Sequence, residues 1–282
     1  MFAATLPSKA AEPGMQGLAE VVFRHRAGQT RLAHLHQVSP LRVLFPHVPD
    51  AEIPQAALVT TSGGVVGGDR LTLKLEVGEG CRAQFMAQAA EKVYRSAGPD
   101  AHIEVELTAA SDAWAEYLPQ ETILFEGARL RRRTRLFATP SARMMAGEMI
   151  IFGRTAMNER VTQGLLREAW EVRRDNRLIW ADAQHLEGDI AASLAAPAGF
   201  GGAVATATLL LLCPDPARHL EAVRELLSSQ PRAAATVVNG LLLLRWLSPD
   251  AALLRRSFAE AWMHLRSAEA GLPAQLPRLW HV

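Results

Sequence analysis

A strict alternation of apolar and polar residues dominates the first half of the chain and restricts its possible folds more than any other feature. In RLTLKLEV, Leu71, Leu73 and Leu75 alternate with polar residues, and HIEVELT at 102–108 repeats the pattern. Successive side chains of a β-strand point to opposite faces, so this period predicts strands with one buried and one solvated face. The signal continues from about residue 18 to residue 136. The sequence therefore predicts a body built mainly from β-strands.

Short turn signals divide the chain into these expected strands. A turn at Gly28 and the GEG sequence at 78–80 each separate two alternating runs. The Asp-Asn pair at 175–176 and the Asn-Gly pair at 239–240 lie between strand-like arms, and such pairs tolerate the positive φ of a tight hairpin. The continuous apolar run ATATLLLLC at 205–213 predicts a fully buried strand.

Helical periodicity is confined to the last quarter of the chain. Asp215 followed by Pro216 marks the start of one helix, because proline is favoured at the first helical position. A second helix is expected to end at Gly271. Apolar residues recur along it at helical spacing, at Leu254, Phe258, Trp262 and Leu265. This stripe predicts either a core contact or a surface on which a partner docks.

No repeat or low-complexity linker interrupts the chain, so we expect a single domain over residues 1–282. The sequence predicts a flexible leader over 1–16, a β-rich body over 17–214, and a hairpin with helices over 215–282. A chain of this length buries a substantial core without disulfides or metals.

Composition and charge exclude several classes of partner. The net charge of +1 gives no basic surplus for nucleic acid. The chain has no apolar run of membrane-spanning length and no secretory signal at its start, so we expect a cytoplasmic protein. Cys81 and Cys213, each in an apolar context, argue against a disulfide scaffold and against a thiolate cluster.

The glycine-rich stretch TSGGVVGGDR at 61–70 invites comparison with phosphate-binding loops. It lacks the Gly-Lys-Ser/Thr ending of a Walker loop, and the negative charge of Asp69 would repel a phosphate. It also lacks the G-x-G-x-x-G spacing of a dinucleotide-binding loop. Two interpretations remain, a tight turn between strands and a site in which Asp69 acts at the start of a strand.

Other catalytic or metal-binding patterns are weak. His34 and His36 share one face of an expected strand, but two ligands do not complete a metal site. Ser62 does not lie in a G-x-S-x-G turn, and neither cysteine has a histidine near it in sequence. Several acids do lie in apolar or glycine-rich strand segments, where they face solvent, pair with arginine or point into a polar cavity.

Five stretches in order resemble the family of the urease accessory protein UreD, also called UreH, and the likeness extends to the closing PRLW at 277–280. The stretches are TSGGVVGGDRL (61–71), QAAEKVYRS (88–96), LPQETILFEGARL (118–130), GEMIIFGR (147–154) and WEVRRDNRLIWAD (170–182). The resemblance implies stacked β-sheets in a helical β arrangement with a few helices. It also implies a non-enzymatic assembly factor that binds UreF and, through UreF, the GTPase UreG, and that docks on apo-urease during nickel insertion.

The resemblance implies nickel as a transient cargo and no tightly bound cofactor. A protein that passes nickel on is expected to offer oxygen ligands rather than the thiolate and imidazole ligands that hold it strongly. The candidate nickel route consists of Asp69, Glu121, Glu126, Glu148 and Glu171. Arg95 and Arg154 are expected to be structural partners of these acids.

The chain departs from the family pattern at two places. Met86-Ala87 stands where relatives usually have two threonines, so a passage lined there would be partly apolar. Asn158 stands where relatives commonly have glycine, and we expect the turn to persist because asparagine tolerates positive φ.

Two alternatives stay open beside the nickel-delivery interpretation. One is an enzyme with a glycine-rich active-site loop, a hydrolase using Asp69 and a glutamate. The other is a β-rich scaffold whose only role is to hold UreF on urease. The C-terminal stripe is the candidate docking surface for UreF.

Overall fold

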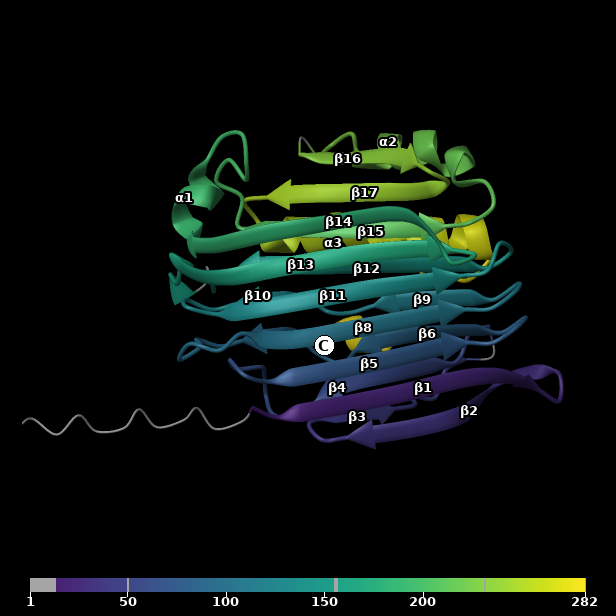
Figure 1. Ribbon diagram of the computed structural model, residues 1–282. Helices are drawn as coiled ribbons and strands as arrows, with labels where there is room; N and C mark the ends of the chain where they lie inside the picture. The colour runs from purple at the N-terminus through teal and green to yellow at the C-terminus, as the bar shows by residue number, and fades with distance from the viewer. Residues whose placement is uncertain (1–13, 50, 155–156, 231, 282) are drawn as a thin grey trace, which may run out of the picture.

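Two β-sheets stack face to face in the computed structural model, which describes residues 14–49, 51–154, 157–230 and 232–281 (Figure 1). The seven-stranded sheet has the order β14-β13-β11-β8-β5-β1-β2. The ten-stranded sheet has the order β16-β17-β15-β12-β9-β6-β4-β3, and the short β7 and β10 pair beside it. Most of the predicted leader, residues 1–13, lies outside the described residues, and β1 already begins at Gln16.

The elements have the following bounds. The seven-stranded sheet contains β1 (Gln16–Arg26), β2 (Gln29–Val38), β5 (Arg70–Val77), β8 (Ala101–Ala109), β11 (Arg129–Ala138), β13 (Gln163–Arg174) and β14 (Arg177–Asp189). The ten-stranded sheet contains β3 (Leu41–Leu44), β4 (Gln55–Thr60), β6 (Arg82–Ala87), β7 (Glu91–Val93), β9 (Trp114–Leu118), β10 (Thr122–Leu124), β12 (Arg143–Phe152), β15 (Ala205–Leu212), β16 (Ala233–Val238) and β17 (Leu241–Ser248). The helices are α1 (Ile190–Ala195), α2 (Leu220–Leu227) and α3 (Ala251–Ala270), with 3-10 turns η2 (Pro216–His219) and η3 (Arg278–His281).

The chain winds between the sheets as a β-solenoid. From β4 to β13 the longer strands fall alternately in the ten-stranded and the seven-stranded sheet, so each coil adds one strand to each layer. Successive coils pair in parallel, as β5 does with β8 and β8 with β11. This architecture confirms the predicted helical β arrangement, and antiparallel hairpins at both ends of the stack complete it.

The alternation of apolar and polar residues corresponds to the two faces of each strand, and the apolar face packs against the other sheet. Leu71, Leu73 and Leu75 of β5 are buried between the sheets, and the alternate residues of that strand are exposed or partly exposed. On the outer face, charged side chains pair across strands, as Lys74 Nζ does with Glu20 Oε1 at 2.9 Å. β2 is an exception because it is an edge strand, and its Leu32 stays 37% exposed.

A second core lies on the other face of the ten-stranded sheet, which α3 covers (Figure 1). The side chains of the predicted stripe are at most 2% exposed there, at Leu254, Phe258, Trp262 and Leu265. The placement favours the core alternative over the docking alternative, since a partner cannot reach these side chains in this structure. The ring of Phe258 approaches Gly147 so closely that a Cβ added there would lie 2.5 Å from it.

The predicted turns and helix ends are largely confirmed. Residues 175–176 and 239–240 adopt positive φ in the β13–β14 and β16–β17 hairpins. Gly271 ends α3 with φ 62°. The helix predicted from Asp215 is instead a 3-10 turn followed by α2, and α1 was not predicted. No helix among the described residues has the length and apolar composition needed to cross a membrane.

Candidate functional site

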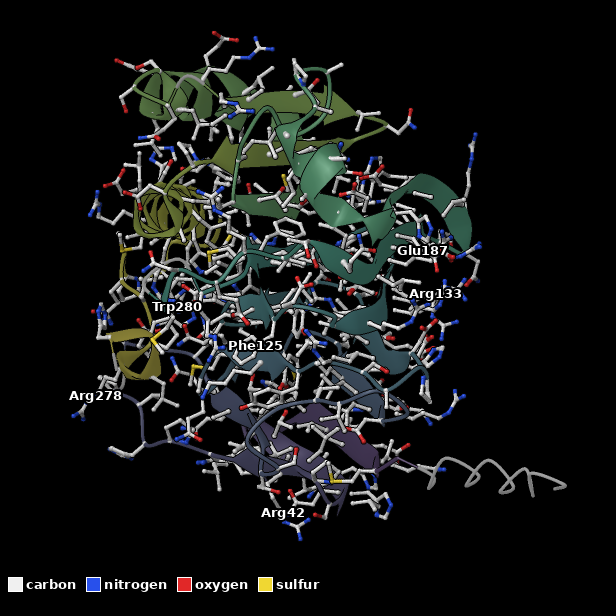
Figure 2. All side chains as sticks on the ribbon, turned by 90° about the vertical axis from the view of Figure 1, so that its left-hand side faces the viewer. Arg42, Phe125, Arg133, Glu187, Arg278 and Trp280 are labelled. Carbon is white, nitrogen blue, oxygen red and sulfur yellow. The ribbon has the colours of Figure 1, made fainter. Side chains whose placement is uncertain are left out.

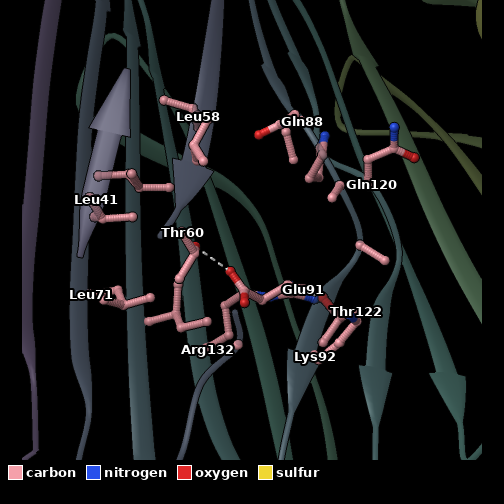
Figure 3. A pocket seen from close by; sticks show the side chains of 18 of the residues that line it. Leu41, Leu58, Thr60, Leu71, Gln88, Glu91, Lys92, Gln120, Thr122 and Arg132 are labelled. Carbon is pink, nitrogen blue, oxygen red and sulfur yellow. Dashed lines mark hydrogen bonds between the residues drawn. The ribbon is translucent and has the colours of Figure 1, made fainter. Parts of the chain in front are cut away.

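A cavity of about 180 Å³ opens between the two sheets, and both sheets line it. Its wall includes Gly63 and Gly64 of the glycine-rich stretch and, from other coils, Glu91, Thr122 and Arg132 (Figure 3). Thr60 Oγ1 donates a hydrogen bond of 2.6 Å to Glu91 Oε2. The solenoid therefore brings polar groups from segments far apart in the sequence to one cavity between its layers.

Arg132 is the centre of a buried polar cluster beside this cavity. Its Nε donates to Glu168 Oε2 at 2.6 Å, its Nη2 to Glu148 Oε2 at 2.7 Å and its Nη1 to Thr122 Oγ1 at 2.7 Å. Trp170 Nε1 donates to the other oxygen of Glu148, also at 2.7 Å. We call these five residues the inter-sheet network, because β11 and β13 of one sheet and β10 and β12 of the other supply them.

The inter-sheet network carries more acid than base. It holds two carboxylates for one guanidinium, and Glu168 Oε1 is buried without a hydrogen-bond partner among the described residues. Burial raises the pKa of Glu168 well above its ordinary value, although the Arg132 charge opposes this. Burial also raises the pKa of Glu91 on the cavity wall. A divalent cation that entered here would meet oxygen ligands only.

Of the five acids predicted to form a nickel route, only Glu148 belongs to the inter-sheet network. Glu121 faces α3 and pairs with Arg255. Glu126 accepts hydrogen bonds from the Thr162 backbone N–H and hydroxyl at 2.5 and 2.7 Å. Burial opposes any fall in the pKa of Glu126, but these hydrogen bonds outweigh it and lower the pKa.

Glu171 lies on the outer face of the seven-stranded sheet, away from the cavity. It pairs with Arg133, and this hydrogen bond lowers the pKa of the Glu171 carboxyl. Figure 2 shows Arg133 on the side of the molecule opposite Trp280. Strand parity directs the Glu171 side chain outward, so the structure does not bring it together with Glu148 at the inter-sheet network.

Asp69 fastens the first described residues to the glycine-rich stretch. The side chain is 1% exposed, and its two oxygens accept hydrogen bonds from the backbone N–H groups of Met15 and Val66, at 2.8 and 2.9 Å. The stretch itself is a tight turn between β4 and β5. A Cβ on Gly64 would lie 2.5 Å from the Tyr94 ring, which explains the glycine. The turn interpretation is therefore confirmed, and Gly63 and Gly64 of the turn also line the cavity, whereas Asp69 itself does not.

We expect Asp69→Ala to lower the free energy of unfolding by about 1.5–3 kcal/mol, because hydrogen bonds to a charged acceptor are lost and two N–H groups lose their partner. Urea denaturation followed by far-ultraviolet circular dichroism measures the change. Asp69→Asn keeps one acceptor and should lose less. Equal stability of wild type and Asp69→Ala would show that the hydrogen bonds of Asp69 to Met15 and Val66 do not stabilise the fold.

Of the two arginines expected to be partners of these acids, Arg154 has a different partner in the structure. Arg154 Nε pairs with Glu159 Oε2 at 2.7 Å, and its guanidinium lies 4.1 Å from the centre of the Phe125 ring. Within the described part of the chain, Arg154 forms no ion pair with any of the five candidate acids. Arg95 lies beside Gly127 and its charge helps to lower the pKa of Glu126, in agreement with the prediction.

The structure shows where the residues of the two departures from the family pattern lie. Ala87 lines the inter-sheet cavity, so that part of the wall is apolar. Met86 is buried on the α3 side of the same sheet. Asn158 adopts φ 55°, which confirms the turn. His34 lies on the edge strand β2, with Nε2 3.6 Å from Glu20 Oε2, and belongs to no group of three possible metal ligands within the described part of the chain.

A second buried network lies under α3, on the opposite face of the ten-stranded sheet. Arg266, 1% exposed, donates from Nε to Glu116 at 2.9 Å and from Nη2 to Glu52 at 2.5 Å. Gln84 Nε2 also donates to Glu116. Burial raises the pKa of Glu116, while Arg266 opposes the rise.

Sequence reasoning missed Arg132, Glu168 and both acids of the second network, although a signal for the first two exists. Arg132 shares strand parity with Leu130, and Glu168 shares it with Leu166, both of which are fully buried. A charged residue in the apolar register of an alternating strand must point inward. Inspecting parity, and not only apolar surroundings, would have selected these two residues and rejected Glu171.

The two cysteines are buried and free. Burial, with the negative charge of Glu269 as the next contribution, raises the pKa of the Cys213 thiol to about 12. Because the thiolate is the nucleophilic form, this environment does not favour nucleophilic catalysis by Cys213.

Comparisons with known proteins converge on one family. A family model described as UreD urease accessory protein matches residues 15–281. The urease accessory protein UreD of Magnetococcus marinus is 45% identical over 287 residues, which cover 99% of each chain. UreD of a Methylobacterium species is 42% identical over 90% of each chain. UreD 3 of a Bradyrhizobium species is 40% identical over 94% of this chain and 93% of its own.

Proposed function

Because this chain belongs to the family of UreD urease accessory proteins, we propose that it assists nickel insertion into apo-urease. It does so as a scaffold that binds UreF and, through UreF, UreG and apo-urease, in the cytoplasm. Nickel is the cargo of this complex and not a resident cofactor of the chain. The proposal extends the accessory role of the family to a route for the ion through the space between the sheets.

The unpartnered Oε1 of Glu168 supports this route most directly. A buried carboxylate oxygen without a hydrogen bond is costly, and Glu168 contacts the cavity wall through Arg132, so this atom is suited to a transient cation. Glu91 and the hydroxyls of Thr60 and Thr122 supply further oxygen ligands along the same wall. The nearby Arg132 charge keeps the binding weak, so the ion is released again.

The hydrolase alternative finds no support in this geometry. Both oxygens of Asp69 already accept backbone hydrogen bonds, so the carboxylate is not free to act as a general base. The scaffold alternative predicts the same complex with UreF but no dependence on the cavity acids. Nickel content therefore distinguishes the two interpretations.

The test uses Glu168→Gln in cells that co-express UreF, UreG and apo-urease. We expect nickel per urease active site, measured by mass spectrometry of purified urease, to fall to less than half, because an amide, unlike a carboxyl group, cannot ionise to bind the cation. Glu171→Gln is the matched control, since it makes the same substitution three residues along β13, on the outer face of the sheet, and it should load nickel like wild type.

Co-purification of Glu168→Gln with UreF at the wild-type level is the control that excludes a folding defect. Full nickel loading with an intact complex would contradict the route and leave the scaffold function. Asp69→Ala is less suitable for this test, because the loss of its backbone hydrogen bonds changes stability as well as the cavity wall.

A further inference from the structure

Three potential metal ligands from separate elements meet at one end of the ten-stranded sheet. Cys213 follows β15, His219 lies in η2, and Glu269 lies in the last turn of α3. All three are buried, and one ligand atom from each, a sulfur, a nitrogen and an oxygen, lie within 4.8 Å of one another. We call this group the Cys-His-Glu cluster, and it shares no residue with the two networks described above.

The lone pairs of this cluster already converge on a cation, the guanidinium of Arg218. Arg218 Nε donates to His219 Nε2 at 3.1 Å, and its Nη2 donates to Glu269 Oε2 at 2.5 Å. The same His219 Nε2 lies 2.8 Å from the same Glu269 Oε2. The imidazole nitrogen can serve only one of these contacts at a time, as acceptor from Arg218 or as donor to Glu269. A metal ion placed between them would use both lone pairs at once.

The Arg218 guanidinium can move away from the Cys-His-Glu cluster. The Arg218 side chain is 51% exposed, whereas those of His219 and Glu269 are 6% and 3% exposed. Arg143 Nη1 lies 3.7 Å from the other oxygen of Glu269. Movement of the exposed Arg218 side chain would open the cluster toward water on that side, and a water could complete a four-coordinate shell there.

We propose that Cys213, His219 and Glu269 bind a single divalent cation of the zinc type, with Arg218 occupying the same lone pairs when no ion is bound. One sulfur, one nitrogen and one oxygen ligand suit Zn²⁺, Co²⁺ and Ni²⁺ and do not suit Mg²⁺ or Ca²⁺. Binding replaces the thiol proton of Cys213 by the metal, so the proton passes to solvent. The site ties the end of β15 to the end of α3, and it does not depend on the proposed nickel route.

The test is a titration of the metal-free, full-length protein with Co²⁺, followed by the thiolate-to-cobalt charge-transfer absorption and then by displacement with Zn²⁺. We expect one Co²⁺ per chain. Cys213→Ser should abolish the charge-transfer band and weaken binding at least about tenfold. Cys81→Ser is the matched control, because it removes the other buried thiol, and it should leave the titration unchanged.

Arg218→Gln makes the test independent of a folding defect in the ligand variants. It removes the competing cation and keeps all three ligands, so we expect Co²⁺ to bind several-fold more tightly than to wild type. Absence of the charge-transfer band in both wild type and Arg218→Gln would overturn the site and leave the cluster an ion pair. A band of equal strength in Cys213→Ser would also overturn it. Neither result would bear on the nickel route, which is tested by the nickel content of purified urease.

Discussion

Replacing Arg132 with methionine is expected to lower the free energy of unfolding by about 3–5 kcal/mol at neutral pH, because it leaves Glu148 and Glu168 buried without their counter-charge. Arg132 is 7% exposed and donates to both carboxylates and to Thr122. Methionine retains much of the side-chain volume of arginine, so the loss of stability comes from the missing charge and not from a cavity. Urea denaturation followed by tryptophan fluorescence measures the change.

The loss in Arg132→Met should shrink as the pH falls. The folded-state pKa of Glu168 is already raised, so the folded protein binds more protons than the unfolded chain, and stability decreases as the pH rises through that pKa. The Arg132 charge opposes this shift, so removing Arg132 raises the pKa of Glu168 further. The difference between variant and wild type should therefore be largest above the folded pKa and smaller near pH 5.

Arg133→Met is the matched control for Arg132, one residue along the same strand and on the opposite face. Its partner Glu171 is partly exposed, and exposed ion pairs contribute about 0–1 kcal/mol. Combining Arg132→Met with Glu148→Gln and Glu168→Gln should recover much of the loss. Equal stability of Arg132→Met and Arg133→Met would show that the inter-sheet network does not stabilise the layers.

Trp262→Ala is expected to lower the free energy of unfolding by about 3–5 kcal/mol, because it opens a cavity under α3. Trp262 is fully buried and stacks near Phe258, with ring centroids 6.2 Å apart. Its Nε1 has no hydrogen-bond partner in the described structure, so Trp262→Phe should lose much less. Chemical denaturation of the full-length chain measures both.

The same substitution decides between the core and docking interpretations of the α3 stripe. Glu260→Ala, on the exposed face of the helix, is the control and should stay within about 0.5 kcal/mol of wild type. Below its unfolding temperature, Trp262→Ala should still co-purify with UreF. Lost UreF binding without lost stability would reverse our conclusion and make the stripe a partner surface.

Local sequence patterns predicted the strands and hairpins, because interactions between neighbouring residues determine these elements. The alternation around Leu73 and the Asn239-Gly240 pair each specify a strand or a hairpin from a few neighbouring residues, and both are as expected. The pairing of strands into two layers came from the family resemblance, because no local pattern states which parallel strand lies beside which. α1 was missed because its six residues are too few to show periodicity.

The candidate site was harder to predict for the same reason. Glu148 was selected correctly, yet Arg132 and Glu168, which contact it, come from other coils that only the solenoid brings together. The Cys-His-Glu cluster shows the limit more clearly. Its Glu269 lies 50 residues beyond His219, so neither residue appeared to have a neighbour of matching chemistry in the sequence.

Because α3 follows every strand of the ten-stranded sheet in the chain, its position has a consequence for synthesis on the ribosome. Arg266 reaches back across 214 residues to Glu52, and the coils between them can stack before this contact exists. Until α3 emerges, the outer face of the ten-stranded sheet exposes the apolar side chains that the helix later covers. Newly made chains therefore pass through a stage that is prone to aggregation, which ends when α3 packs on the sheet.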